Sequence, residues 1–280
     1  MSRASDRWGL VITFLVVITV ILSAIQFVYA LFSPPPLIGV PMIATGIICL
    51  LIYGIIHSVL LKGWFHTVIF VIFSFVISFL TEWLGVNYGL WFGSYNYTEL
   101  LGPMAYGVPF LIIVCWEGII YPSHVLVDWL AGLDKKGYDF GPFGSVIVSF
   151  LAATATALFT TVWDLMTDPM AVHLRWWIWH GGGEYFRSLH GGVPLSNFFG
   201  WFSAVFVISF TYRAVFARKA RYKQPIDNFS LFLVSFYTLW FFGVANVLLS
   251  LGITLPVFIG AFTMGPIIAL AWVKYFAQRL

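Results

Sequence analysis

The sequence predicts an all-α integral membrane protein with about eight transmembrane helices. Of its 280 residues, 61% are hydrophobic and only 9% are charged, whereas about a quarter of the residues in a soluble domain carry a charge. Eight apolar runs are each long enough to cross a hydrocarbon core, which takes about 20 residues. These runs cover residues 8–32, 40–61, 64–82, 104–131, 144–165, 196–217, 229–250 and 254–276.

Two of these runs need individual treatment. The first follows two arginines and contains no small-residue cleavage site, so we expect it to be retained as a span rather than removed as a signal peptide. The fourth is longer than a span requires and contains Pro109 and Pro122, which predicts a kink or a helix end near Tyr121. Because no repeat or linker divides the chain, we expect a single transmembrane domain over residues 1–280.

The basic residues predict the orientation of the spans. If the N-terminus lies in the cytoplasm, twelve of the fourteen Lys and Arg residues fall on the cytoplasmic side, and only Arg175 and Arg187 fall on the other. Such an excess is typical of the cytoplasmic loops of membrane proteins. We therefore expect a multi-pass protein of the cell membrane, with both termini in the cytoplasm and two long polar loops on the non-cytoplasmic side.

Composition also excludes several partners and sites. The net charge is only +3 and the basic residues form no face with interleaved aromatics, so nucleic acid is not an expected partner. Cys49 and Cys115 lie inside apolar runs without CxxC or metal-ligand spacing, which predicts neither a disulfide nor a zinc site. His173, His180 and His190 lack HxxxH spacing, so we predict no metal.

Two polar islands interrupt the apolar sequence, one from Thr81 to Pro103 and one from Trp163 to Trp201. The predicted topology places both on the same side of the membrane, so we expect them to meet and form a site. Their aromatic side chains stand among many glycines, which is typical of a lined cavity, although Trp177 fits an ordinary interfacial belt. The expected substrate-binding residues are Tyr88, Trp91, Tyr95, Tyr97, Trp163, Trp176, Trp179, Asn197 and Trp201.

Four carboxylates at or near membrane depth are the candidate catalytic residues. An ionised side chain there costs about 2.5–3.5 kcal/mol, so it is a functional candidate by default. Glu82 and Asp164 are expected to end their spans, and Glu117 lies within one. Pro169 is expected to place Asp168 on the turn after the helix. Two carboxylates close together in a poorly solvated pocket differ in proton affinity, which suits one to donate a proton and the other to accept it.

Two of these carboxylates, and Asp128, also have structural interpretations. Asp168 could cap the turn before Pro169, and Glu117 could be the partner of a polar side chain on another helix. Asp128, next to Trp129, is expected to be an interfacial residue. Among the four candidates we expect Asp164 to be the proton donor, since an apolar wall beside it raises its proton affinity.

Five segments together resemble the membrane carotenoid-biosynthesis protein family. They are Glu82 at the end of a span, GLWFGSYNY from Gly89 to Tyr97, D-x3-DP from Asp164 to Pro169, W-x-W from Trp177 to Trp179, and GVPLSNFFGW from Gly192 to Trp201. That family includes hydratases that act on γ-carotene in bacteria and on bisanhydrobacterioruberin in archaea. The likeness extends from about Ser78 to Gly265.

The resemblance implies hydration of the terminal C1–C2 double bond of a ψ-end group, which gives a tertiary alcohol. Such an enzyme is a lyase of the hydratase type that needs no cofactor. Its substrate would be a carotenoid within the lipid bilayer, and association with other carotenoid-pathway enzymes stays open. The resemblance does not tell which carotenoid is used or whether both ends are hydrated.

Two other classes of function stay open at this stage. The D-x3-D pair is compatible with a membrane prenyltransferase that holds a diphosphate through Mg²⁺, but no second Asp-rich motif accompanies it. A non-enzymatic transporter could use Glu117 and the many Gly and Pro residues to line a path, but no duplicated half is detectable.

Overall fold

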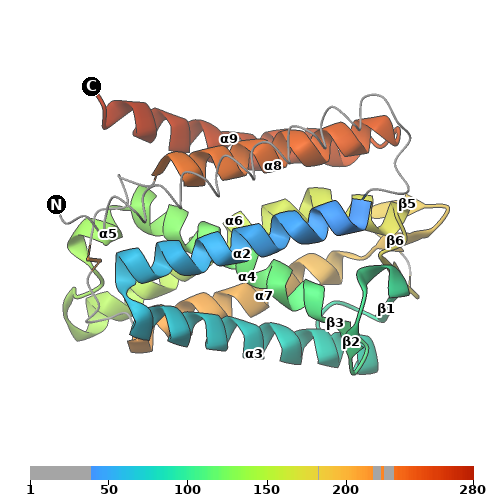
Figure 1. Cartoon of the computed structure of the whole chain (residues 1–280), viewed down its shortest axis with the longest axis horizontal. Coiled ribbons are helices and arrows are strands. Elements are labelled where there is room, and N and C mark those ends of the chain that lie inside the picture. The colour runs from blue at the N-terminus through green and yellow to red at the C-terminus, as the bar shows by residue number, and fades with distance from the viewer. Residues whose placement is uncertain (1–38, 182, 217–221, 224–229) are drawn as a thin grey trace.

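The computed structural model describes residues 39–181, 183–216, 222–223 and 230–280. The expected span over 8–32 lies outside these residues. Within this part of the chain, the long helices run side by side along the long axis of the molecule (Figure 1). They are α2 (Gly39–Lys62), α3 (Trp64–Tyr88), α4 (Phe110–Leu130), α6 (Gly141–His173), α7 (Leu195–Thr211), α8 (Ser230–Ser250) and α9 (Leu255–Ala277).

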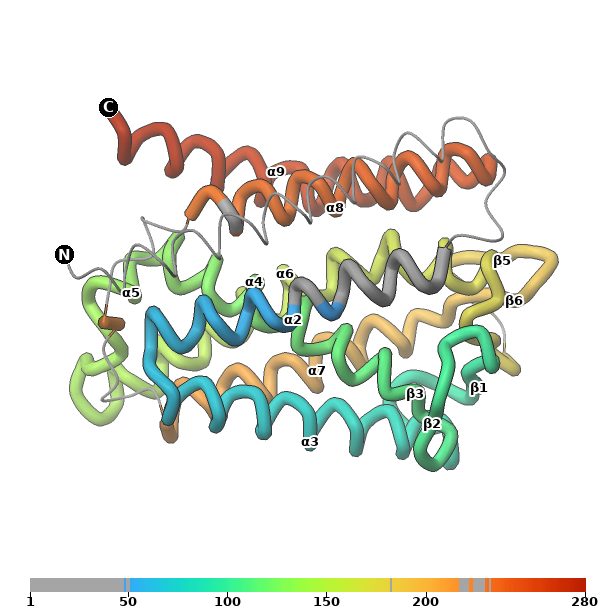
Figure 2. Tube along the Cα trace, in the orientation of Figure 1, coloured from blue at the N-terminus to red at the C-terminus, as the bar shows by residue number. Residues whose placement is uncertain are grey.

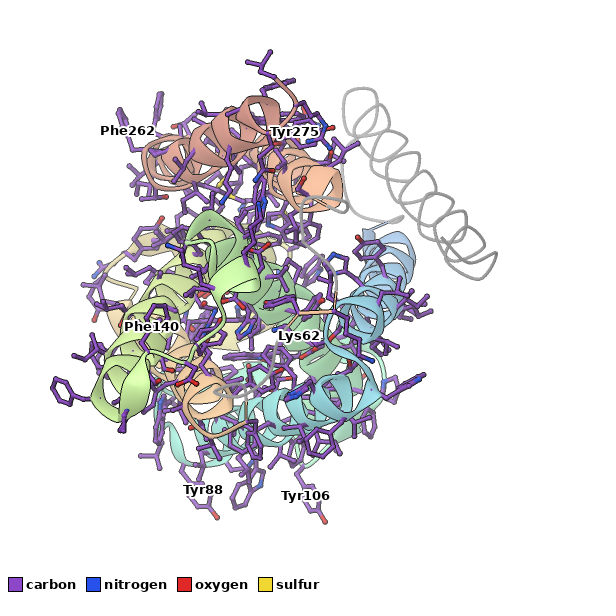
Figure 3. The ribbon with its side chains drawn as sticks, turned by 90° about the vertical axis from the view of Figure 1, so that its left-hand side faces the viewer. Lys62, Tyr88, Tyr106, Phe140, Phe262 and Tyr275 are labelled. Carbon is purple, nitrogen blue, oxygen red and sulfur yellow. The ribbon has the colours of Figure 1, made fainter. Side chains whose placement is uncertain are left out.

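These helices confirm the predicted fold class. Six of them in the described residues are long and apolar enough to cross a membrane, and α2 adds a shorter apolar stretch, Leu51–Lys62. Large apolar side chains such as Phe262, which is 81% exposed, point away from the bundle, as expected for a surface that faces lipid. In the end-on view of Figure 3, Lys62 instead lies in the middle of the bundle, where it is buried.

Helix α6 is at the centre of the packing. It contacts α4, α7, α8 and α9, and α8 and α9 lie together on one side of it, away from α3 (Figure 1). A π-helical turn, η2 (Tyr212–Phe216), continues α7. Helix α6 can therefore present side chains to all four of these helices.

Short strands gather at one end of the bundle, and the short helix α5 (Leu133–Lys136) and the C-terminus lie at the other (Figure 1). Strand β1 (Tyr95–Tyr97) pairs antiparallel with β4 (Trp177–Trp179). Figure 2 follows both polar loops to this end. The prediction that the two islands meet is therefore confirmed. The other elements here are β2 (Met104–Ala105), β3 (Val108–Pro109), β5 (Phe186–Ser188), β6 (Gly191–Val193) and a 3-10 turn, η1 (Glu99–Leu101).

Several predicted span limits were wrong. Helix α3 continues to Tyr88, so Glu82 lies inside the helix rather than at its end. Helix α4 begins only at Phe110, because the preceding residues form the β2–β3 hairpin. It then continues through Pro122 to Leu130, so the alternative of a helix end near Tyr121 was wrong and the kink stays a prediction.

The prediction that Pro169 ends the fifth span was also wrong. Helix α6 continues through Pro169 to His173, and Asp164 and Asp168 both lie within it. A proline inside a helix removes the hydrogen bond to the carbonyl four residues earlier, which here is that of Leu165. The hydroxyl of Tyr185 donates to this carbonyl at 2.8 Å. A donor from the second polar loop thus replaces the missing backbone N–H.

Candidate active site

Asp164 and Asp168 form a buried carboxylate pair on one face of α6. They are separated by one helical turn, so both side chains point toward α7, where Asn197 lies in the first turn. The Asn197 Nδ2 atom donates to Asp164 Oδ2 at 2.7 Å and also to Asp168. Exposure is 4% for Asp164 and 2% for each of the other two residues. One amide group therefore holds both carboxylates.

Glu82, the third carboxylate, accepts hydrogen bonds from three neutral donors. The hydroxyls of Tyr95 and Tyr97 donate to its Oε2 atom, the latter at 2.7 Å, and the indole Nε1 of Trp116 donates to Oε1 at 2.8 Å. The Glu82 side chain is buried. Helices α3 and α4 and strand β1 therefore fix it from three sides.

Tyr95 is the hydrogen-bond donor to Glu82 whose hydroxyl also feels the charge of Asp168. Burial raises the pKa of its hydroxyl well above the usual range, and the charges of Glu82 and Asp168 raise it further. Burial and Glu82 also raise the pKa of Tyr97. Both hydroxyls therefore stay protonated at neutral pH and act as hydrogen-bond donors.

Aromatic rings surround the carboxylates. Trp116 stacks on Trp201 with ring centroids 3.9 Å apart and an interplanar angle of 9°. Trp201 follows Asn197 by one turn of α7, so the stacked pair adjoins the residues that hold Asp164 and Asp168. Trp179 lies 5.5 Å from the Tyr95 ring. Trp116 is fully buried, whereas Trp201 is only partly buried.

Two glycines allow the first polar loop to approach the helices. A Cβ atom at Gly200 would lie 2.5 Å from the Phe92 ring, and one at Gly85 would lie 2.9 Å from the Tyr95 ring. Phe92 also receives the Trp179 indole N–H on its carbonyl at 3.1 Å. The glycines thus permit the contact that brings Tyr95 to Glu82.

A family model described as "Carotenoid biosynthesis protein" matches residues 38–266. The chain belongs to this family. No match was found among curated proteins or among solved structures. The match confirms the family resemblance seen in the sequence, and the chain has a role in carotenoid biosynthesis. The matched region of this carotenoid biosynthesis protein contains all three carboxylates.

Five of the expected site residues make contacts other than with the three carboxylates, or are exposed. Glu117 accepts a hydrogen bond from Ser74 of α3, one residue beyond Trp116 but directed elsewhere. Trp163 faces α8, where its ring stacks on Trp240 at 4.8 Å. Tyr88 and Trp91 are exposed, and the Trp91 indole donates to Ser203 at 2.8 Å. Trp176 packs against Trp177.

Sequence reasoning missed two members of the site, Trp116 and Phe92. Trp116 lies in an apolar run next to Glu117, and the ionisable Glu117 was selected as the candidate instead of its aromatic neighbour. Its contact with Glu82 joins residues 34 positions apart on different helices. No local sequence pattern could reveal that contact. Phe92 could have been found, because it lies within the GLWFGSYNY segment that the sequence analysis singled out.

The expectation of an interfacial Asp128 was wrong. Asp128 is fully buried, and its Oδ1 atom pairs with Arg213 at 2.8 Å. Lys62 lies 3.8 Å from Oδ2, and the hydroxyls of Tyr138 and Tyr222 also donate to this carboxylate. Two residues expected in cytoplasmic connections, Lys62 and Arg213, are therefore partners of a buried anion.

Within the described residues, no group of three or more His, Cys, Asp or Glu side chains could hold a metal. Asp164 and Asp168 both accept from the Asn197 amide N–H group, which would face a cation bound between them. The arrangement instead provides acidic oxygens, a neutral donor and aromatic faces.

Proposed function

We propose that the protein is a carotenoid hydratase that adds water across the terminal C1–C2 double bond of a ψ-end group. The observation that carries the proposal is the pair Asp164 and Asp168, held by Asn197 among aromatic rings in a member of the carotenoid biosynthesis family. Hydration of an alkene needs a proton donor, a base and a place for a cation. These residues provide all three.

In the proposed reaction the Asp164 carboxyl group donates its proton to C2. The π electrons of the double bond form the new C2–H bond, which leaves a tertiary cation at C1. Water adds to C1 and loses a proton to Asp168, and the product is a tertiary alcohol. Proton transfer from Asp168 back to Asp164 closes the cycle. Because C1 is formally oxidised and C2 formally reduced by equal amounts, the addition of water involves no net redox change, and we expect no cofactor.

Aromatic faces supply the stabilisation that the cation needs. A desolvated cation over an aromatic face gains about 2 kcal/mol or more. Trp201 suits this role because one face stacks on Trp116 while the side chain stays partly exposed. Its position one turn after Asn197 keeps it near the proposed acid and base.

Glu82 is proposed to position the aromatic residues. It accepts hydrogen bonds from Tyr95, Tyr97 and Trp116, and a carboxylate occupied by three donors is poorly suited to protonate an alkene. Through Trp116 it acts on Trp201, and through Tyr95 it acts on Trp179. A substitution at Glu82 should therefore impair catalysis in part.

The substrate class explains why the enzyme consists of membrane helices. A carotenoid is too insoluble to leave the bilayer, so its polyene would lie among the spans while the end group reaches the loop end of the bundle. The membrane is thus the medium that delivers the substrate, and neighbouring pathway enzymes would share it.

The test is to supply the purified protein with a ψ-ended carotenoid in isotopically labelled water. We expect a product heavier by one labelled water, with the label on the tertiary carbon. A desaturated or prenylated product would instead overturn the hydratase proposal. Asp164→Asn should abolish formation of this product. Asp139→Asn is the matched control and should leave it intact, since Asp139 is exposed.

A further inference from the structure

A second set of buried polar residues runs along α4. Glu117, Tyr121, His124 and Asp128 follow one another at intervals of four, three and four residues, so they share one face of the helix. All four side chains are buried. Helix α4 packs against α2 and α3, and the polar face points into this interface rather than toward lipid.

Each of these residues has a polar partner on a neighbouring element. Ser74 of α3 donates to Glu117. On α2, His57 Nδ1 lies 2.7 Å from the Tyr121 hydroxyl, and the Lys62 ammonium donates to His124 Nε2 at 3.0 Å. The last residue of the face, Asp128, pairs with Arg213.

The polar face continues toward the candidate active site along α3. Ser74, Ser78 and Glu82 are four residues apart and all buried. Polar groups thus follow one another turn by turn from Glu82 to Lys62. The 18-residue rise of α3 from Trp64, beside Lys62, to Glu82 corresponds to about 27 Å at 1.5 Å per residue. The hydrocarbon core of a bilayer is about 30 Å thick.

Helix packing alone does not require the ionisable residues Glu117 and Lys62. Membrane helices pack through small residues and through hydroxyl, amide and imidazole groups that hydrogen-bond across helices, whereas charged groups at this depth are costly and mark paths for ions or protons. Hydroxyl, carboxyl and imidazole groups can both donate and accept a proton. Arginine can only donate, so the pair of Asp128 and Arg213 is a fixed element at the end of the row.

We propose that α2, α3 and α4 carry a proton path between the two ends of the bundle, from Glu82 through Glu117, Tyr121 and His57 to His124 and Lys62. Each group passes on the proton it receives and returns to its starting state, so one positive charge crosses per proton. A counter-ion must balance that charge. This activity goes beyond the proposed hydration, which recovers the proton it uses and needs no such path.

The experiment uses the full chain in vesicles that contain a pH-sensitive dye. A potassium gradient and valinomycin set a membrane potential that drives protons across the membrane. The fluorescence of the dye then reports the change in internal pH, whose direction follows the sign of the potential. The wild-type protein should raise the proton flux above that of protein-free vesicles. Glu117→Gln should abolish the increase, while Glu99→Gln, the same change at an exposed residue, should leave it intact.

Two further variants keep the test decisive if Glu117→Gln does not fold. Tyr121→Phe removes only a hydroxyl and should also abolish the increase, whereas Glu117→Asp retains a titratable group and should restore it at least in part. Wild-type flux equal to that of protein-free vesicles would overturn the proposal. The same holds if folded Glu117→Gln and Tyr121→Phe conduct like the wild type.

Discussion

The two ends of the bundle both contain buried carboxylates, but their partners differ. At the loop end, Asp164, Asp168 and Glu82 accept hydrogen bonds from an amide, two hydroxyls and an indole, all of them neutral. At the other end, Asp128 faces the cations of Arg213 and Lys62. Neutral donors stabilise a carboxylate anion less than paired cations do, so the carboxyl groups at the loop end can exchange a proton more readily than Asp128 can. The loop end is therefore suited to chemistry and the other end to holding helices together.

The largest expected effect is a loss of turnover when Asp164, at the loop end, is replaced. Asp164→Asn keeps the size and the contact with Asn197 but removes the transferable proton. Loss of general acid catalysis typically costs about 10²–10⁴-fold, and we expect a fall of that size in kcat for hydration. Turnover of the purified variant, measured beside Asp139→Asn, checks this. Near-normal kcat would remove Asp164 from the role of proton donor.

The next effect concerns stability at the opposite end. Arg213→Met removes the closer of the two cations that face the buried Asp128 and leaves Lys62 at 3.8 Å as its cationic partner. Breaking a buried ion pair costs about 3–5 kcal/mol. We expect unfolding in detergent at a clearly lower temperature than for the wild type. Lys136→Met is the matched control, because Lys136 is exposed. An unchanged unfolding temperature would show that the ion pair does not support the fold.

A smaller effect is expected from the stacked indoles. Trp201→Leu keeps an apolar side chain but removes the aromatic face, and the loss of about 2 kcal/mol of cation stabilisation corresponds to about 30-fold in rate. The fall should appear in kcat more than in KM, since the cation exists only during the reaction. A change confined to KM would indicate that Trp201 binds the polyene instead.

The smallest effect concerns one hydrogen bond to Glu82. Tyr97→Phe removes a single donor while Tyr95 and Trp116 remain, and a net loss of about 0.5–1.5 kcal/mol is expected. Hydration should therefore fall by about 2- to 13-fold. A loss as large as that of Asp164→Asn would contradict a positioning role for Glu82 and would assign its cluster to the proton transfer itself.

The sequence was sufficient to predict the class of fold and much of the loop end. Apolar runs predicted the helices, and the two polar islands were expected to meet, as the pairing of β1 with β4 shows that they do. Asp164, Asp168 and Asn197 were all among the expected residues, because ionisable and amide groups are conspicuous in an apolar chain.

Long-range partners could not be predicted in the same way. Pro169 signals a helix end locally, and only the distant hydroxyl of Tyr185, which bonds the freed carbonyl, explains why α6 continues. Asp128 and Arg213 are 85 positions apart, so the sequence around each residue does not reveal its partner. The neighbouring Trp129 indicated an interfacial Asp128 instead of a buried pair. In each case the deciding interaction belongs to the tertiary structure.

The comparison of the two ends is tested most directly by one pair of matched substitutions, Asp164→Asn and Asp128→Asn. For each purified variant, hydration of a ψ-ended carotenoid per folded molecule and the unfolding temperature are measured together. We expect Asp164→Asn to unfold like the wild type but to lose turnover, and Asp128→Asn to unfold at a lower temperature while its folded fraction stays active. The reverse pattern, an active Asp164→Asn beside a stable but inactive Asp128→Asn, would place the chemistry at the opposite end and contradict the proposed site.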